Sequence, residues 1–191
     1  MILVSACLLG CACRYDGQSK PYPLAQELAK RGLAVPVCPE QLGGLPTPRT
    51  PAERCGDRVV TRDETDVTAQ YERGAQEALR LAQLTGCTLA LLKEKSPSCG
   101  CGRIYDGTHT GRLTDGNGVA VELLLQNGVR VFGETQLEEL LDSLAARKKT
   151  REEKKVCNET DGKRLVQEDL DAEHSGYVLG GRYGSSGGFS D

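Results

Sequence analysis

The sequence contains no tryptophan, one methionine, two histidines and only 4% aromatic residues. No apolar run approaches the roughly 20 residues that a membrane-spanning helix needs, so we expect no membrane partner. The 24 basic and 27 acidic residues give a net charge of −3, which provides no general attraction to nucleic acid. These absences favour a small molecule as the partner.

The start of the chain, MILVSACLLG, has neither the basic leader nor the small-residue cleavage site of a signal peptide. We therefore expect a cytoplasmic protein, whose thiols are kept reduced and do not form a disulfide framework. Metal binding, thiol catalysis or simple burial as small apolar side chains must then explain the cysteines. There are nine, at positions 7, 11, 13, 38, 55, 87, 99, 101 and 157.

Short apolar runs alternate with helical patterns along the first 150 residues. Strands are predicted at 2–6, 33–37, 88–93 and 130–132. Helices are predicted near 24–32, 66–86, 117–125 and 135–148, the last with Thr135 as N-cap. This alternation predicts an α/β fold, a small Rossmann-like three-layer sandwich around a mainly parallel four-stranded sheet.

The end of the chain has a different composition. Residues 151–191 carry 6 basic and 9 acidic residues, so the whole net charge of −3 lies there and residues 1–150 are neutral. The last 16 residues contain six glycines and three serines, a composition typical of flexible segments. We expect one domain over 1–150 and a flexible C-terminal extension over 151–191.

Three thiols follow three separate predicted strands. Cys7 comes after ILVSA, Cys38 after LAVPV, and Cys99 shortly beyond TLALLK. Ligands of open parallel sheets bind beyond the carboxyl ends of the strands, so we expect these three cysteines to meet in one pocket. Three thiolates without a fourth ligand suit an iron-sulfur cluster with one open iron, or a catalytic zinc ion. Neither His109 nor His174 is conveniently placed to complete a mixed zinc site.

Four motifs in this order resemble the domain-of-unknown-function family numbered 523, which includes thiouracil desulfidases. They are SACLLG (5–10), CRYDG (13–17), VCPEQLGGLPTPR (37–49) and KEKSPSCGCGRIYDG (93–107). The resemblance covers about residues 1–148. It implies a 4Fe-4S cluster held by three cysteines, whose fourth iron receives the sulfur of a thiolated pyrimidine in a hydrolytic, non-redox desulfuration.

Carried onto this chain, the resemblance implies that the cluster ligands are Cys7, Cys38 and Cys99. Cys13 or Cys101 remains an open alternative for one of them. The resemblance also implies that Glu40 and Ser96 form the polar catalytic pair. Glu40 would act as general base on water, and Ser96 would orient that water or act as nucleophile.

Four further residues are predicted to bind the substrate: Arg14, Tyr15 and Asp16 after the first motif, and Arg49 in the proline-rich loop. An arginine facing the pocket would suit a phosphate, which makes a thiolated nucleotide a possible substrate beside the free base. A thiolated tRNA also remains a possible substrate.

The two proposed catalytic residues also have plainer structural interpretations. Glu40 suits the first turn of a helix, and Ser96 suits a turn before proline.

The main hypothesis is therefore an iron-sulfur-dependent desulfidase that releases hydrogen sulfide and uracil from thiouracil or a related pyrimidine. Two alternatives come from other classes of protein. One is a sulfur or iron-sulfur carrier without turnover, and the other is a zinc-stabilised nucleic-acid-binding domain, which the neutral charge of residues 1–150 does not support.

Overall fold

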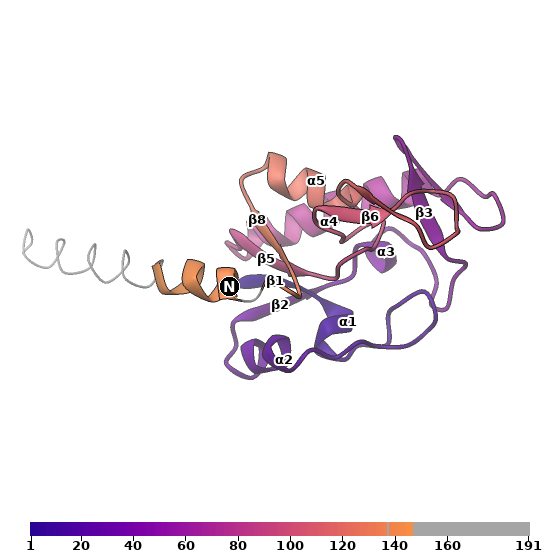
Figure 1. The fold of residues 1–191 in the computed structure, drawn as a ribbon. Coiled ribbons are helices and arrows are strands. Elements are labelled where there is room, and N and C mark those ends of the chain that lie inside the picture. The colour runs from indigo at the N-terminus through magenta and orange to yellow at the C-terminus, as the bar shows by residue number, and fades with distance from the viewer. Residues whose placement is uncertain (137, 147–191) are drawn as a thin grey trace, which may run out of the picture. The chain divides into compact units, whose positions relative to one another are not determined.

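The computed structural model describes residues 1–136 and 138–146. Contacts group Met1–Asp142 into one compact unit, and the fold described here is that of this unit. Its centre is a four-stranded sheet in the order β2-β1-β5-β8, with all neighbouring strands parallel (Figure 1). The strands are β1 (Ile2–Ser5), β2 (Ala34–Val37), β5 (Leu89–Leu92) and β8 (Arg130–Gly133). The predicted mainly parallel four-stranded sheet is confirmed.

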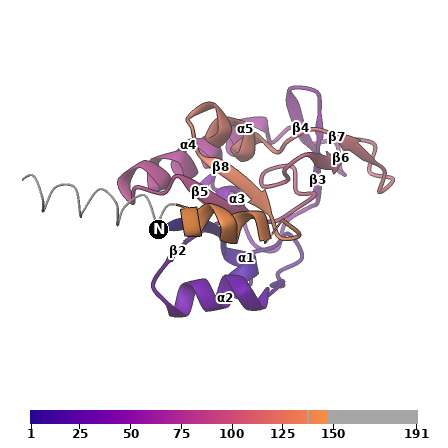
Figure 2. The ribbon, with the colours of Figure 1, turned by 60° about the vertical axis from the view of Figure 1, so that its left-hand side comes forward.

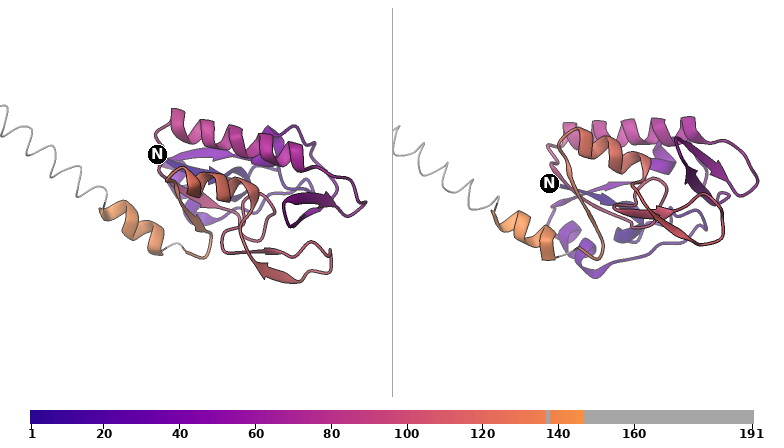
Figure 3. Two further views of the ribbon diagram at one scale, coloured as in Figure 1. Left: turned by 90° about the horizontal axis from the view of Figure 1, so that it is seen from above. Right: turned by 45° about the horizontal axis from the view of Figure 1, so that its top comes forward.

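Helices cover both faces of the sheet (Figures 1 and 2). The long helix α4 (Thr68–Leu84) and α5 (Val119–Gln126) lie side by side on one face (Figure 3). On the other face lie α2 (Pro23–Lys30) and the one-turn helix α1 (Ala6–Leu9). The arrangement is the three-layer sandwich expected from the alternation of strands and helices. No helix in the described part of the chain has the length and apolar character to cross a bilayer.

The core forms where the sheet meets α4 and α5. All four residues of β5 are buried, as expected for a strand with neighbours on both edges and helices on both faces. Leu92 packs there against the small side chains of α4 and the larger ones of α5. Burying a leucine stabilises the fold by about 1.5–3 kcal/mol, and this core keeps the strand ends in a fixed position.

A close approach of two helices fixes the short helix α3 (Pro39–Leu42) against α4. A Cβ on Gly74 of α4 would lie 1.9 Å from the carbonyl oxygen of Pro39, and one on Gly43 would lie 1.9 Å from that of Gln70. Only glycine fits at either contact. The position of α3, which carries Glu40, therefore depends on two residues without side chains.

Two β-hairpins were not predicted from the sequence. One pairs β3 (Ala52–Cys55) with β4 (Arg58–Thr61), and the other pairs β6 (Arg103–Tyr105) with β7 (Leu113–Asp115). A two-residue Gly56-Asp57 turn joins β3 to β4, with Gly56 at a φ of 61°. Glycine followed by aspartate between short strands is a recognised hairpin signal. The hairpins lie at the end of the unit toward which the parallel strands point (Figure 1).

The predicted N-cap of the last helix is wrong by one position. The first intrahelical bond runs from the Leu140 N–H to the Gln136 carbonyl, which makes Gln136 the N-cap. The Thr135 hydroxyl instead donates to Glu94 Oε1 at 2.5 Å. The predicted tail over 151–191 lies outside the described residues, as do Cys157 and His174.

Candidate functional site

A cavity of about 420 Å³ lies at the carboxyl edge of the sheet. Its walls come from the ends of β1, β2 and β5, from the loops that follow them and from the two hairpins. The volume falls within the range of about 300–1,000 Å³ that is usual for small-molecule sites. The position agrees with the rule that open α/β sheets bind ligands beyond the carboxyl ends of their strands.

Four thiols line this cavity: Cys7, Cys13, Cys38 and Cys99. Cys7 lies in the first helical turn after β1, and Cys38 is the residue between β2 and α3. Cys99 follows β5 by seven positions and is 6% exposed. The structure thus brings together the three cysteines that sequence reasoning selected and adds Cys13.

The other cysteines lie elsewhere. Cys101, the second open alternative from the sequence, does not line the cavity; its sulfur lies 3.8 Å from the carbonyl oxygen of Val131 on β8. Cys87 is buried in the core beside Thr85. Cys11 and Cys55 are exposed. Among the described residues, Cys13 is therefore the fourth cysteine at the cavity, beside the three that were selected from the sequence.

Three of the cavity thiols, those of Cys13, Cys38 and Cys99, have raised pKa values. Burial raises the pKa of Cys99 to about 12, although hydrogen bonds with Ser5 and Ser98 oppose this. A hydrogen bond with Cys13, followed by burial, raises the pKa of Cys38. The pKa of Cys13 is raised to about 11: its contact with Cys38 lowers it, but its contact with Cys7 and burial raise it further. At neutral pH these three groups are thiols, and a metal centre that binds them must displace their protons.

The spacing of these thiols argues against a single metal ion. Among the described residues, no three Cys, His, Asp or Glu side chains surround one point closely enough to hold an ion. A cluster makes a different demand, because each cysteine binds a different iron and the ligands stand further apart. An all-sulfur donor set from several loops is the set that iron-sulfur clusters use, and it fits the group that the sequence predicted.

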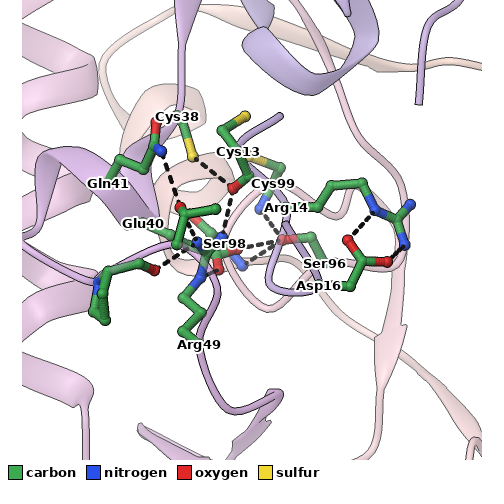
Figure 4. Close-up of polar contacts among 12 residues, drawn as sticks. Cys13, Arg14, Asp16, Cys38, Glu40, Gln41, Arg49, Ser96, Ser98 and Cys99 are labelled. Carbon is green, nitrogen blue, oxygen red and sulfur yellow. Dashed lines mark hydrogen bonds and ion pairs between the residues drawn. The ribbon is translucent and has the colours of Figure 1, made fainter. Parts of the chain in front are cut away.

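A buried ion pair stands beside the thiols (Figure 4). Arg49 Nε donates to Glu40 Oε2 at 2.7 Å, and the two side chains are 6% and 14% exposed. The same guanidinium donates to three more oxygens, those of the Pro46 carbonyl, the Thr47 hydroxyl and the Cys13 carbonyl. Arg49 was predicted to bind substrate. In the structure four of its five N–H groups donate to protein oxygens, and it holds Glu40 in place. Direct contact of Arg49 with substrate stays a prediction.

Glu40 has a second partner across the cavity. The Ser96 hydroxyl donates to Glu40 Oε1 at 3.3 Å, so the predicted catalytic pair is brought together from positions 56 residues apart. Ser96 Oγ also accepts the N–H groups of Ser98 and Cys99, each at 3.1 Å. The plainer reading of Ser96 as a turn residue is therefore also true. One side chain shapes the Cys99 loop and contacts the carboxylate.

Tyr71 is a site residue that the sequence reasoning missed. It lies on α4, is 2% exposed and lines the cavity. Burial, followed by the charge of Glu40, raises its pKa, so the phenol stays protonated beside the carboxylate. Tyr71 lies at helical spacing with Gly74 and Ala78, which are also buried on α4, and an aromatic residue in such a position is normally part of the core.

Side chains of the CRYDG segment contact one another. Arg14 forms an ion pair with Asp16 at 3.1 Å and stacks on the Tyr15 ring, 5.7 Å from its centroid. Arg14 and Tyr15 line the cavity, whereas Asp16 does not. Figure 4 shows the Arg14–Asp16 pair to one side of the Glu40 group. Asp16 is therefore placed to orient Arg14, and a direct contact with substrate stays a prediction.

The hairpins supply the outer wall of the cavity, which sequence reasoning did not find. Glu53 on β3 is buried, and its Oε2 accepts the N–H groups of Gly107 and His109 at 3.1 and 2.9 Å. His109 has a φ of 57°, and its ring nitrogen Nδ1 lies 3.7 Å from Glu53 Oε1. Three cations that line the cavity form no ion pair within the described residues: Lys20, Arg62 and Lys95.

These features define a class of protein: an α/β sandwich whose carboxyl-edge cavity gathers thiols around a buried acid–arginine pair. The 2-thiouracil desulfurase family matches residues 2–136, and the chain belongs to this family. The resemblance to family 523 is thereby confirmed.

Two similar proteins were found. A solved structure described as the 4Fe-4S-dependent thiouracil desulfidase TudS is 52% identical, covers 76% of this chain and 97% of its own, and superposes with a TM-score of 0.74. The uncharacterized protein YbbK of Bacillus subtilis (strain 168) is 42% identical over 151 residues, which are 74% of this chain and 100% of YbbK.

Proposed function

We propose that this protein is an iron-sulfur-dependent desulfidase that hydrolyses a thiolated pyrimidine such as thiouracil to uracil and hydrogen sulfide. The observation that carries the proposal is the meeting of Cys7, Cys38 and Cys99 with the Glu40–Ser96 pair in one cavity. Membership of the 2-thiouracil desulfurase family and likeness to TudS support it.

Cys7, Cys38 and Cys99 are the proposed ligands of a 4Fe-4S cluster. Each lies directly at, or in the loop after, the carboxyl end of a different strand, and the three strands are neighbours in the sheet. Cys13 contacts the thiols of Cys7 and Cys38 and is the alternative ligand that the geometry leaves. When bound, a cluster with an open iron supplies a soft Lewis acid, which takes thiocarbonyl sulfur in preference to carbonyl oxygen.

The chain's own groups provide the proton transfers. Glu40, held by Arg49, takes a proton from a water molecule as that water attacks the carbon bearing sulfur, and returns it to the departing fragment or the ring nitrogen. Ser96, which contacts Glu40 Oε1, orients the water between the carboxylate and the substrate. The ion pair keeps Glu40 in one orientation in a largely water-excluded site, where such positioning is most effective.

Charge along the cavity bears on the substrate. Six basic residues line it and three acidic ones do: Arg14, Lys20, Arg49, Arg62, Lys93 and Lys95 against Glu40, Glu53 and Glu94. A 4Fe-4S cluster with three thiolates adds about one negative charge, which leaves a positive excess. We propose that the site accepts the free base and also tolerates a phosphate on the ring substituent. Comparing kcat/KM for 4-thiouracil and 4-thiouridine monophosphate at low and high salt tests whether the positive charge of the cavity helps to bind the phosphate.

The cluster is tested by purifying the protein anaerobically and counting iron and acid-labile sulfide per chain. The activity is tested by incubating the same protein with 2-thiouracil and 4-thiouracil and measuring the release of sulfide. Alanine at position 7, 38 or 99 should abolish both cluster absorbance and sulfide release, whereas Cys101→Ala should keep both. A single variant among the first three that keeps both shows that its assignment as a ligand is wrong.

Glu40→Gln and Ser96→Ala separate an enzyme from a cluster carrier. Glu40→Gln should bind iron and sulfide as the unmodified protein does and should lose about 10²–10⁴ in turnover, the usual contribution of a general acid–base group. Ser96→Ala should lose turnover as well, and its iron and sulfide content is measured beside it, because Ser96 Oγ also accepts the Ser98 and Cys99 N–H groups. Full turnover in Glu40→Gln would favour a protein that only carries a cluster or sulfur. Colourless protein with stoichiometric zinc would instead favour the zinc alternative.

A further inference from the structure

His109 lines the cavity but has no role in the proton transfers proposed above. It lies in the loop between β6 and β7, and its side chain is 18% exposed. Its ring nitrogen Nδ1 is buried and, within the described residues, has no hydrogen-bond partner. Leaving a buried polar atom without a partner destabilises a protein, so such an atom calls for an explanation.

Glu53 on β3 fixes the position of this ring. Its side chain is 11% exposed, and its Oε2 accepts the N–H groups of Gly107 and His109 at 3.1 and 2.9 Å. Its other oxygen, Oε1, lies 3.7 Å from His109 Nδ1, which is slightly too long for a hydrogen bond. The carboxylate therefore holds the loop backbone through one oxygen and faces the imidazole with the other. A small movement of the ring would complete the hydrogen bond.

The backbone of His109 has a conformation that favours glycine. Its φ is 57°, in a region that other residues seldom adopt. Three non-glycine residues in the described part of the chain have such a φ, and two of them, Lys95 and His109, line the cavity. Conformations of this kind persist where the surrounding structure enforces them, and they gather at ligand sites. The loop thus keeps a side chain at the cavity in a position where glycine would fit with less strain.

The carboxylate also determines which ring nitrogen carries the hydrogen. We assign the hydrogen to Nδ1, because the acceptor that this nitrogen faces is Glu53 Oε1. In the neutral ring Nε2 is then an acceptor. No hydrogen bond within the described residues uses Nε2, so it is available to a molecule in the cavity. A thiolated pyrimidine base matches it, because the ring carries N–H groups next to the carbon that bears sulfur.

We propose that Nε2 of His109 accepts a hydrogen bond from a ring N–H of the pyrimidine, and that Glu53 is the positioning residue that orients the imidazole. This inference rests on the proposed function, because it takes a pyrimidine as the molecule in the cavity. It adds a binding contact from the outer wall of the cavity. The reaction leaves the contact with the base unchanged, so its loss should raise KM and leave kcat as it is.

Binding of uracil to the anaerobically reconstituted full-length protein, measured by titration calorimetry, tests this contact without a chemical step. His109→Phe keeps an aromatic ring and removes both ring nitrogens, so uracil should bind about tenfold more weakly. KM for 4-thiouracil should rise by the same factor, with kcat and iron content unchanged. His109→Asn, which tolerates the left-handed backbone, should give the same result if the phenylalanine variant fails to fold. Thr110→Ala changes a neighbouring residue that does not line the cavity, and should bind uracil as the unmodified protein does.

Glu53→Gln separates a positioning role from a structural one. It removes the charge that fixes the hydrogen on Nδ1, so it should weaken uracil binding as His109→Phe does. The double variant should bind uracil no more weakly than His109→Phe alone, because Glu53 acts on the base only through the imidazole. A purely structural pair would instead lower the thermal midpoint of the variants and leave their affinity for uracil unchanged.

Three results would overturn the proposal. One is an unchanged affinity for uracil in folded His109→Phe or His109→Asn protein. Another is a double variant whose loss equals the product of the two single losses, which would show that Glu53 does not act through His109. The third is unmodified protein that binds neither uracil nor 4-thiouracil. The proposed function fails in a different way, if the unmodified protein binds uracil but releases no sulfide from thiouracil.

Discussion

The buried pair of Arg49 and Glu40 gives the sharpest quantitative prediction. Replacing Arg49 by methionine keeps the length of the side chain and removes its charge, which leaves the carboxylate of Glu40 without its counterion at 14% exposure. Removing one partner of a buried pair costs about 3–5 kcal/mol. With a urea m-value of about 2 kcal/mol/M, the unfolding midpoint of the cluster-free protein should fall by about 1.5–2.5 M at pH 8.

Protonation removes the unpaired charge, so the loss should be greatest at pH 8 and smaller at pH 5. The sign follows from linkage. If a carboxyl group binds its proton more tightly in the folded variant than in the unfolded chain, the free energy of unfolding of that variant decreases as the pH rises. The control is Glu40→Gln combined with Arg49→Met, which should be more stable at pH 8 than Arg49→Met alone. A midpoint within 0.5 M of the parent (about 1 kcal/mol at that m-value), or a double variant no more stable than the single one, would refute the reasoning.

Three further changes test the site from other directions. Tyr71→Phe removes the phenol beside Glu40 and should lower turnover by about tenfold with full iron content and an altered pH–rate profile; an unchanged profile would contradict a positioning role. Gly74→Ala should destabilise the protein and reduce iron binding, although alanine normally favours a helix by about 1 kcal/mol, because its Cβ meets the Pro39 carbonyl at 1.9 Å; a stabilised variant in a melting experiment would refute that contact. Cys101→Ala should keep the full iron and sulfide content, and loss of the cluster would restore Cys101 as a ligand.

The strands of the central sheet were predictable because each is a short apolar run, and β2, β5 and β8 each begin two or three positions after a glycine. Their order was not read from the sequence, but the meeting of their carboxyl ends was, since it follows from parallel strands joined by helices. That single rule placed Cys7, Cys38 and Cys99 at one cavity before any coordinates were considered.

What the sequence could not provide was the direction of side chains in loops. Arg49 lies in a proline-rich segment without periodicity, so nothing local showed that its guanidinium would turn toward Glu40. Cys13 follows the first helix in an irregular stretch, and its contact with Cys38 depends on a neighbouring strand. Glu53 and His109 come from two hairpins of three or four residues per strand, too short to give a clear alternating pattern.

The cavity thiols and the hydrophobic core share a residue. Cys99 lines the cavity and is also buried in the core with Leu3, Val37 and Leu92. A change that loosens the packing of β5 should therefore displace a cavity thiol as well, so we expect core stability and the arrangement of the thiols to vary together among variants.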